Sequence, residues 1–222
     1  MRFILTTDWE DGLADLSQRL IEELAAGKRV LWLLSGGSNI PASVTVMENI
    51  SPKHRQKLTV MLGDERYGPI GHPDSNGAQL AKAGFKPAPA TMLAVLQADL
   101  SLAQTTAHYQ EVATQAFAAA DVIIAQFGIG EDGHLAGILP GSPASHEATA
   151  LVSGYSCDPF GRLTLTFPAL RRVTAAYTFA FGITKHPALR DLQRKRLDLP
   201  TQPAQILKQL DEAYVYNDQV GV

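Results

Sequence analysis

Three ionisable side chains lie close together in the glycine-rich segment 128–134, which reads GIGEDGH and contains Glu131, Asp132 and His134. A histidine can take a proton from water near neutral pH, because its unperturbed pKa is about 6.5. A neighbouring carboxylate can fix the tautomer of the ring by accepting a hydrogen bond from its other nitrogen. The segment follows the apolar run 122–127, as a loop that leaves a buried strand would. We therefore expect His134 to be a general base that Glu131 or Asp132 orients; in the alternative, the segment is a structural turn and His134 only caps a following helix.

Polar or glycine-rich residues follow three more apolar runs in the same way. They are Ser35, Gly36, Gly37 and Ser38 after the run 30–34, Asp64 and Arg66 after 58–62, and Gly182 and Lys185 after 175–181. In open α/β sheets, ligands bind beyond the carboxyl ends of the strands. The four segments are therefore predicted to converge on one crevice.

The turn 35–38 has the chemistry of an anion site. Its backbone N–H groups, followed by a helix that begins near Pro41, would form a cradle for phosphate. Lys185 could add a point charge and Arg162 a bidentate one. The alternatives are a tight turn without a ligand and two solvated surface cations.

Taken together and in this order, the segments resemble the 6-phosphogluconolactonases and, more broadly, the superfamily that these enzymes share with the glucosamine-6-phosphate deaminases. The resemblance covers most of the chain. It rests on SGGS at 35–38, DER at 64–66, SN at 75–76, GIGEDGH at 128–134, LPG at 139–141, RLTLT at 162–166, and Gly182 with Lys185.

The resemblance implies hydrolysis of 6-phospho-D-glucono-1,5-lactone to 6-phosphogluconate in the oxidative pentose phosphate pathway, with no metal and no cofactor. It also implies that the segment 64–66 lines the sugar site. Arg66 would then steady the oxyanion of the tetrahedral intermediate or hold a sugar oxygen, and Asp64 would bind hydroxyls or relay a proton. Asn76 is expected to be a further hydroxyl contact.

Two departures from the family pattern change the expected walls of the site. Lactonases usually carry a Thr-Ala-Ser-Leu-Phe-like run after the loop histidine, where this chain reads LAGIL at 135–139, and Ser/Thr-Pro after the first glycine pair, where Asn39 and Ile40 here precede Pro41. A deaminase-like isomerase is one alternative function, but the family's ring-opening carboxylate is absent from 138–140, which reads ILP. A sugar-phosphate-binding module that has lost catalysis is the other.

Composition favours a single domain over residues 1–222, since no linker or charge block divides the chain. The net charge of −3 with interspersed signs predicts no nucleic-acid partner, and no apolar run approaches the ~20 residues that span a membrane. A small sugar phosphate is the expected partner, the single Cys157 and the lack of a signal peptide favour the cytoplasm, and the oligomeric state is left open. No HExxH or CxxC motif is present, so no metal site is expected.

Apolar runs that alternate with amphipathic segments predict an α/β fold, with a mostly parallel, Rossmann-like sheet covered by helices on both faces. Asp8 is expected to cap the first helix, residues 163–166 to form a half-exposed strand, and Cys157 to lie in a loop. Strands are expected at 29–34, 58–62, 91–95, 121–127, 163–166, 174–181 and 213–216, and helices after Asp8, from Pro41, and at 77–83, 99–120, 187–196 and 203–210.

Overall fold

Seven strands form one sheet in the computed structural model, which describes residues 1–221. Every neighbouring pair in the sheet is parallel, in the order β1-β10-β9-β6-β2-β3-β5. The strands are β1 (Arg2–Leu5), β2 (Val30–Leu34), β3 (Leu58–Leu62), β5 (Thr91–Met92), β6 (Val122–Phe127), β9 (Ala175–Ala180) and β10 (Glu212–Asn217). The predicted mostly parallel sheet is thus confirmed.

The central strands are buried along their whole length. β2, β6 and β9 have no exposed residue, as expected of parallel strands that are covered on both faces. The four predicted polar segments follow four strands that are adjacent in the sheet: β9, β6, β2 and β3. The chain passes from β2 to β3 on one side and returns with β6 on the other. The crevice between β2 and β6 is therefore a topological switch point, where ligands bind in folds of this kind.

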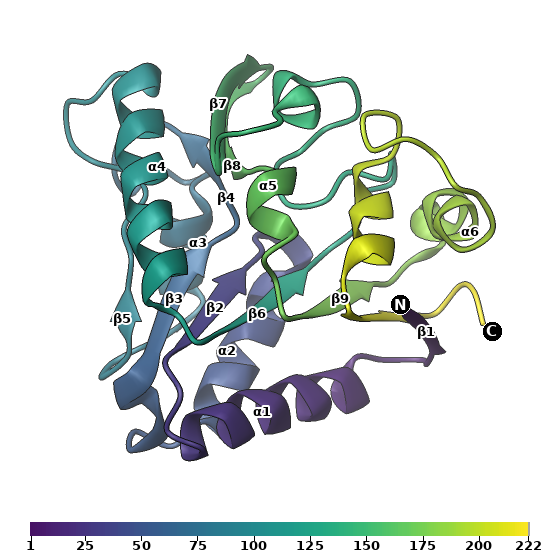
Figure 1. The fold of residues 1–222 in the computed structure, drawn as a ribbon, viewed down its shortest axis with the longest axis horizontal. Coiled ribbons are helices and arrows are strands. Elements are labelled where there is room, and N and C mark those ends of the chain that lie inside the picture. The colour runs from purple at the N-terminus through teal and green to yellow at the C-terminus, as the bar shows by residue number, and fades with distance from the viewer. Residues whose placement is uncertain (222) are drawn as a thin grey trace.

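Helices lie on both sides of this sheet (Figure 1). In that view α1 and α2, which pack against each other, lie below the sheet, whereas α4 and α5 lie above it. The helices are α1 (Glu10–Ala25), α2 (Ile40–Asn49), α3 (Asn76–Lys82), α4 (Leu102–Ala119), α5 (Phe167–Leu170) and α6 (His186–Arg194). Across the described residues, no helix is both long enough and apolar enough to cross a membrane.

A second, antiparallel sheet stands beside the C-terminal edge of the first. It has the order β4-β8-β7, with β4 (Asp64–Tyr67), β8 (Phe160–Leu165) and β7 (Val152–Cys157). β4 begins one residue after β3 ends, so Gly63 alone carries the chain from one sheet to the other. The small sheet thus places Asp64 and Arg66 directly above the crevice.

Several local predictions were wrong in detail. The strand at 163–166 is not half exposed: β8 is the middle strand of the small sheet, and Leu163, Thr164 and Leu165 are all buried. Cys157 ends strand β7 and does not lie in a loop. The segment predicted as a helix at 203–210 is the 3-10 helix η5 (Pro203–Gln209).

Other boundaries moved for local reasons. Asp8 does not occupy the cap position of α1, which belongs to Trp9, although the Asp8 carboxylate accepts a hydrogen bond from the Glu10 N–H at 3.0 Å. The strand expected at 91–95 is the two-residue strand β5, which lies at the edge of the sheet. The sequence analysis did not predict β1, whose four residues are too few to show a clear pattern.

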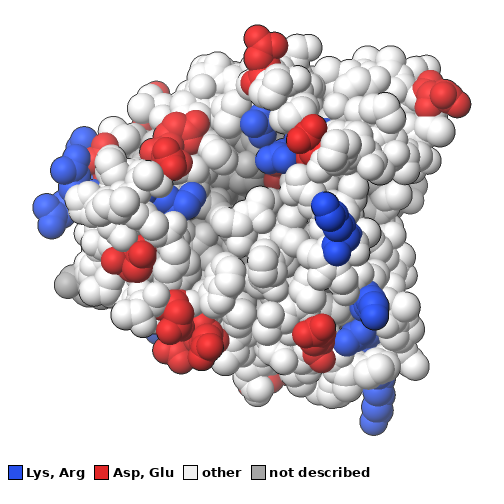
Figure 2. Space-filling view, turned by 180° about the vertical axis from the view of Figure 1, so that it is seen from behind, with Lys and Arg blue, Asp and Glu red and all other residues white. Residues whose placement is uncertain are grey.

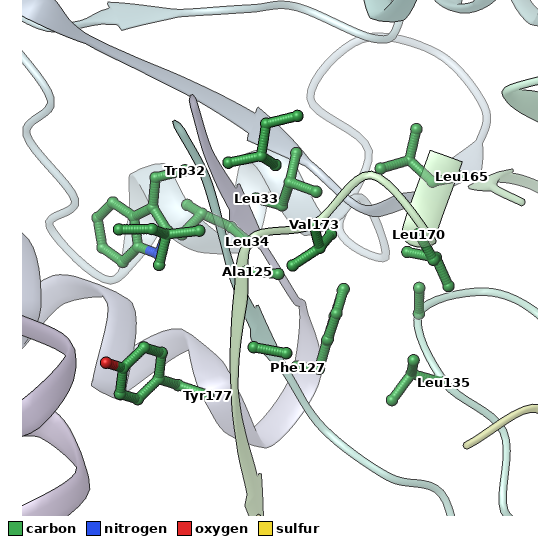
Figure 3. Close-up of a cluster of buried hydrophobic side chains, with 14 of the residues drawn as sticks. Trp32, Leu33, Leu34, Ala125, Phe127, Leu135, Leu165, Leu170, Val173 and Tyr177 are labelled. Atoms are coloured by element: carbon green, nitrogen blue, oxygen red, sulfur yellow. The ribbon is translucent and has the colours of Figure 1, made fainter. Parts of the chain in front are cut away.

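A hydrophobic cluster joins the two sheets beneath the crevice (Figure 3). Phe127 from the end of β6 lies near Leu135 of the following loop, and Leu165 of β8 closes the cluster from the small sheet. All three side chains are fully buried. The loop after β6 is therefore anchored in the core immediately after His134.

Candidate active site

The predicted crevice is a pocket of about 130 Å³ at the carboxyl ends of the central strands. Figure 2 shows a hollow in one face of the molecule, with Lys and Arg side chains around it. The pocket is lined by Ser35, Gly36, Gly37, Ser38, Asn39, Asp64, Arg66, Gly128, Ile129, Gly130, His134, Ala136, Arg162 and Lys185. All four polar segments therefore contribute to it, as the strand pattern predicted. Of the predicted site residues, Glu131, Asp132 and Asn76 are not among those that line it.

His134 is oriented by Asp132. The Nδ1 atom of His134 lies 2.7 Å from Oδ1 of Asp132, and the same oxygen accepts the His134 backbone N–H at 3.1 Å. Because Nδ1 faces a carboxylate, it carries the proton, and Nε2 of the neutral ring is the basic nitrogen. Burial by itself would raise the pKa of Asp132, but the hydrogen bonds from the His134 ring and backbone outweigh it and hold that pKa below its usual value. The carboxylate therefore stays ionised while it orients the ring.

Glu131, the other carboxylate considered for this role, is exposed and makes no hydrogen bond with His134. Its charge acts on Lys185 instead. The alternative in which His134 caps a helix is wrong, because no helix begins at residues 135–142. The loop turns back on itself, with the Gly130 N–H donating to the His134 carbonyl at 3.0 Å.

A glycine is required at position 130 because its backbone lies against the His134 and Asp132 side chains. A Cβ atom there would lie 2.0 Å from Nδ1 of His134 and 2.6 Å from Oδ1 of Asp132. Real Cβ atoms do not approach other heavy atoms so closely. Gly130 therefore makes room for the histidine ring to lie against the loop backbone.

The glycine turn after β2 packs closely against Asn76 and, through its own Asn39, against Gly128 in the loop after β6. A Cβ atom on Gly36 would lie 2.0 Å from Oδ1 of Asn76, and one on Gly128 would lie 2.6 Å from Nδ2 of Asn39. Gly37 has a φ of +62°, in the left-handed region that favours glycine. The 3-10 helix η1 (Gly37–Asn39) then leads directly into α2, which has Pro41 in its first turn. Backbone N–H groups at the start of this helical stretch are suited to an anion.

Arg66 and Arg162 face each other across the small sheet, as direct partners in the pairing of β4 with β8. Like charges at directly opposite positions repel and cost stability. Within residues 1–221 neither guanidinium forms an ion pair, and the buried Nε atom of each has no hydrogen-bond partner. Arg66 does donate to the Asp74 carbonyl at 3.1 Å. Two unpaired cations held together at a pocket are the arrangement expected of an anion site.

Asp64 lies buried at the base of this arginine pair. Its burial raises the pKa of the carboxyl group, although the positive charges of Arg66 and Arg162, and that of His134 when it is protonated, act in the opposite direction. A carboxyl group can accept a hydrogen bond in either state and donate one when protonated. Asp64 is therefore able to bind a hydroxyl group as donor or acceptor.

Lys185 enters the pocket from the opposite side. It ends the short 3-10 helix η4 (Ile183–Lys185), and its ammonium group donates a hydrogen bond to the Ile129 carbonyl. Burial lowers the pKa of Lys185, while the carboxylates of Glu131 and Asp132 partly offset this effect. The pocket thus brings together three cations, Arg66, Arg162 and Lys185, on two walls.

Asn76 was predicted to contact substrate, but the structure places it behind the pocket. Its side chain is fully buried, donates to the Asp64 carbonyl at 2.9 Å, and packs against Gly36. Asn76 thus connects the glycine turn with β4. Its position is that of a residue that holds two walls of the site together.

Two buried polar residues that support the site, Glu65 and Gln126, were not predicted from the sequence. The buried Glu65 carboxylate accepts hydrogen bonds from the Arg66 N–H, the Ser75 hydroxyl, and the Asn76 and Gly77 N–H groups, and so fixes the start of α3. Burial raises the Glu65 pKa against these four hydrogen bonds. The signal in the sequence was the position of Glu65, a charged residue between the two predicted pocket residues Asp64 and Arg66.

Gln126 is a polar residue within the buried strand β6. It donates to the Asn39 carbonyl at 3.0 Å and accepts from the Ser43 hydroxyl at 3.1 Å, so it ties the glycine turn to the neighbouring strand. Its signal in the sequence was a single glutamine in an otherwise apolar run. His72 lies beside the segment 64–66 but does not line the pocket: its Nε2 atom is 2.9 Å from the Arg66 carbonyl oxygen.

The unusual segment 135–139 proves to be part of the core. Leu135 and Ile138 are fully buried, and only Ala136, with a φ of +51°, lines the pocket. The Gly137 N–H donates to the Thr164 hydroxyl at 3.0 Å, which attaches the loop to the small sheet. The departure from the family pattern therefore changes the packing under the site and one small wall residue.

The sequence resembles those of known proteins over most of its length. The sequence model of the family described as glucosamine-6-phosphate isomerases/6-phosphogluconolactonase matches residues 8–215. A curated protein named 6-phosphogluconolactonase, from Synechocystis sp., is 28% identical over 220 residues, which cover 95% of this chain and 90% of its own.

Solved structures show the same fold. The crystal structure of 6-phosphogluconolactonase from Thermotoga maritima superposes with a TM-score of 0.78 at 23% identity, over 97% of this chain and 98% of its own. A monomeric glucosamine-6-phosphate deaminase superposes with a TM-score of 0.78 at 17% identity, over 98% of this chain and 97% of its own. The resemblance seen in the sequence is confirmed: the chain belongs to the family of glucosamine-6-phosphate isomerases and 6-phosphogluconolactonases.

Proposed function

We propose that this protein hydrolyses 6-phospho-D-glucono-1,5-lactone to 6-phosphogluconate, the lactonase step of the oxidative pentose phosphate pathway. One observation carries the proposal: a hydrogen-bonded pair, His134 and Asp132, lies at a pocket that also contains three cations. Among the described residues, none of these cations forms an ion pair. The pocket lies at the switch point of the sheet. The pair supplies a base for hydrolysis. The cations supply a site for the phosphate and for the charge that develops on the lactone.

In the proposed reaction, Nε2 of His134 takes a proton from water as the water oxygen attacks the lactone carbonyl. The carbonyl oxygen becomes an oxyanion, and Arg66 is placed to stabilise that charge. When the tetrahedral intermediate collapses, the bond to the ring oxygen breaks, and His134 returns its proton to that oxygen. The product is the open-chain acid, and the histidine is neutral again. Asp132 holds the ring orientation throughout.

The phosphate of the substrate would bind in the same pocket, beside Lys185. We assign it to Lys185 and the backbone of Ser35, Gly36, Gly37 and Ser38, with Arg162 as a second cation. A cation at a helix start and backbone N–H groups are the usual components of a phosphate site. Asp64 would bind sugar hydroxyl groups.

The two alternatives have less support. A deaminase would need the ring-opening carboxylate that the family places after the loop histidine, and residues 135–141 contain no acidic side chain. A binding module without catalysis would have no use for an oriented base, whereas the hydrogen bond between Asp132 and His134 is short and supported by the loop backbone.

The direct test is an assay of purified protein with freshly prepared 6-phosphogluconolactone, with the spontaneous hydrolysis rate subtracted. We expect enzymatic turnover that a chelator does not change, and no release of ammonia from glucosamine 6-phosphate. Ammonia release would favour the deaminase. Tight binding of 6-phosphogluconate without turnover of the lactone would favour the binding module.

A further inference from the structure

A second concave region lies away from the candidate active site, between the C-terminal end of α6 and η5. Its volume is about 690 Å³, within the range of small-molecule sites. Four basic side chains line it, Arg194, Lys195, Arg196 and Lys208, and none of its lining residues is acidic. For a chain with a net charge of −3, this is a marked local excess of positive charge.

Two of these four cations have no partner among the described residues. Lys195 pairs with Asp191 at 2.9 Å, and Lys208 donates to the Lys195 carbonyl. Over residues 1–221, however, the guanidinium groups of Arg194 and Arg196 make no hydrogen bond or ion pair. Burial and the charge of Arg196 lower the pKa of Lys208. The cations are therefore held together against their mutual repulsion.

The helix dipole explains only part of this arrangement. A cation in the last turn of a helix is stabilised by the helix carbonyls, which accounts for Arg194. Arg196 and Lys208 lie outside α6, so the carbonyl groups at its end do not stabilise their charges in this way. The remaining lining residues are amides and apolar groups that can contact the rest of a ligand: Gln193, Gln205, Gln209, Leu197, Leu199 and Met1.

A short series of contacts connects this region with the catalytic loop. Gln205, which lines the region, donates from its side chain to Oε1 of Gln202 at 2.6 Å. Gln202 packs on Gly133, where an added Cβ atom would lie 2.6 Å from its Cγ atom. The Ala204 N–H also donates to the Gly133 carbonyl at 3.0 Å. Gly133 immediately precedes His134, so a ligand that moves Gln205 would act on the backbone that carries the base.

We propose that this basic region is a regulatory site for a small molecule that carries two linked phosphate groups, and that its occupancy adjusts the position of His134 through Gln205, Gln202 and Gly133. Two or three clustered cations match a diphosphate better than a single carboxylate or monophosphate. The compact, concave shape favours a small molecule over a nucleic acid, whose backbone would need a longer basic track.

Binding can be measured by calorimetry with inorganic pyrophosphate and, separately, with ADP, both without Mg²⁺. The variant Arg194→Gln/Arg196→Gln removes two charges from the region, and neither side chain makes a contact that the fold needs. The control Lys82→Gln/Lys86→Gln removes two exposed charges elsewhere. We expect at least one of the two probes to bind to the wild type and the control, with about a tenfold loss of affinity in the first variant. Binding of ADP alone would identify a nucleotide ligand, whereas binding of both would show that the diphosphate suffices.

The link to His134 is tested by the amide NMR signals of Gly133 and His134, which do not depend on lactonase activity. At a probe concentration near the wild-type Kd, addition of a probe that binds should shift both signals in the wild type and the control, and shift them several-fold less in Arg194→Gln/Arg196→Gln. The proposal is overturned if neither probe binds, if binding is lost in Lys185→Ala but kept in the arginine variant, or if binding leaves both signals in place. A preference for a basic-groove ligand such as single-stranded DNA over both probes would also overturn it.

Discussion

The two walls of the candidate active site are built in different ways. The wall that carries the base is local: Asp132, His134 and Gly130 lie within five residues, and their hydrogen bonds stay within the loop. The wall that carries Arg66 and Arg162 depends on the pairing of β4 with β8, two strands far apart in the sequence. In the first wall, the polar groups already have hydrogen-bond partners, and these hold His134 in position as a proton acceptor. The second holds like charges together and is completed only by an anion. Variants of the two walls and of Lys185 should therefore differ in the kinetic or thermodynamic quantity that they change.

The largest expected effect is on the rate of hydrolysis. His134→Ala should lower kcat by about 10² to 10⁴ fold, the usual contribution of a general base, with folding intact because the ring is partly exposed. The measurement is steady-state turnover of fresh lactone, corrected for the background. His146→Ala, which removes an exposed histidine outside the pocket, is the matched control. Wild-type turnover in His134→Ala would place the base elsewhere.

The next effect should appear in KM. Lys185→Ala removes a charge-assisted contact of roughly 1.5–3 kcal/mol, so KM should rise about tenfold to a hundredfold, with a smaller change in kcat. A contact far from the reacting carbonyl binds substrate and transition state about equally, and its loss appears in KM. Lys185→Arg should recover part of the affinity. If Lys185→Ala has an unchanged KM, the phosphate is bound by Arg162 and its neighbours instead.

The unpaired cations should make the fold sensitive to a bound anion. At a concentration of 100 times its Kd, 6-phosphogluconate should stabilise the protein by about 2.7 kcal/mol, which corresponds to a rise in Tm of about 5–10 °C for a chain of this size. Gluconate, which lacks the phosphate, should have little effect at the same concentration. Thermal unfolding followed by circular dichroism measures both, and equal shifts would argue against a phosphate site.

The smallest effect concerns stability and pH. Because burial raises the pKa of Asp64 in the folded protein, its stabilising contribution is fully present below the unfolded pKa of about 3.9 and is lost as the pH rises through the folded pKa. Asp64→Asn should therefore make the free protein more stable than wild type at pH 7, and this gain should disappear in acid. Urea unfolding at pH 7 and pH 3.5 checks the sign. A variant that is less stable at pH 7 would show that Arg66 and Arg162 need this carboxylate.

The same difference between the walls explains what the sequence could predict. The buried parallel strands can be recognised in the sequence as apolar runs. Because the carboxyl ends of adjacent parallel strands lie at the same edge of the sheet, residues after β2, β3, β6 and β9 were correctly predicted to share one pocket. Of the small sheet, only the strand at 163–166 was predicted: β4 is polar throughout and pairs with the distant β8, and the segment that forms β7 was expected to be a loop at Cys157. The sequence also could not show whether Glu131 or Asp132 orients His134, because this depends on how the loop turns back on Gly130.

Buried polar supports were equally hard to predict. Asn76 was expected to touch substrate because the family pattern contains it, but its side chain fills the space beside Gly36 instead. Glu65 lies beside two pocket residues, yet only the structure shows that it points to the start of α3. A polar residue near a site can thus line the pocket or hold it together, and the sequence does not distinguish these roles.

The proposed mechanism rests on two separate roles: His134 supplies the base, whereas Lys185, with the glycine turn, recognises the phosphate. It is tested most directly by the ratio of kcat/KM for 6-phosphogluconolactone to kcat/KM for gluconolactone, measured in wild type, His134→Ala and Lys185→Ala. We predict that His134→Ala lowers both values and leaves the ratio unchanged, whereas Lys185→Ala lowers the ratio about tenfold or more. A ratio that falls in His134→Ala, or that stays at the wild-type value in Lys185→Ala, would contradict the division of roles.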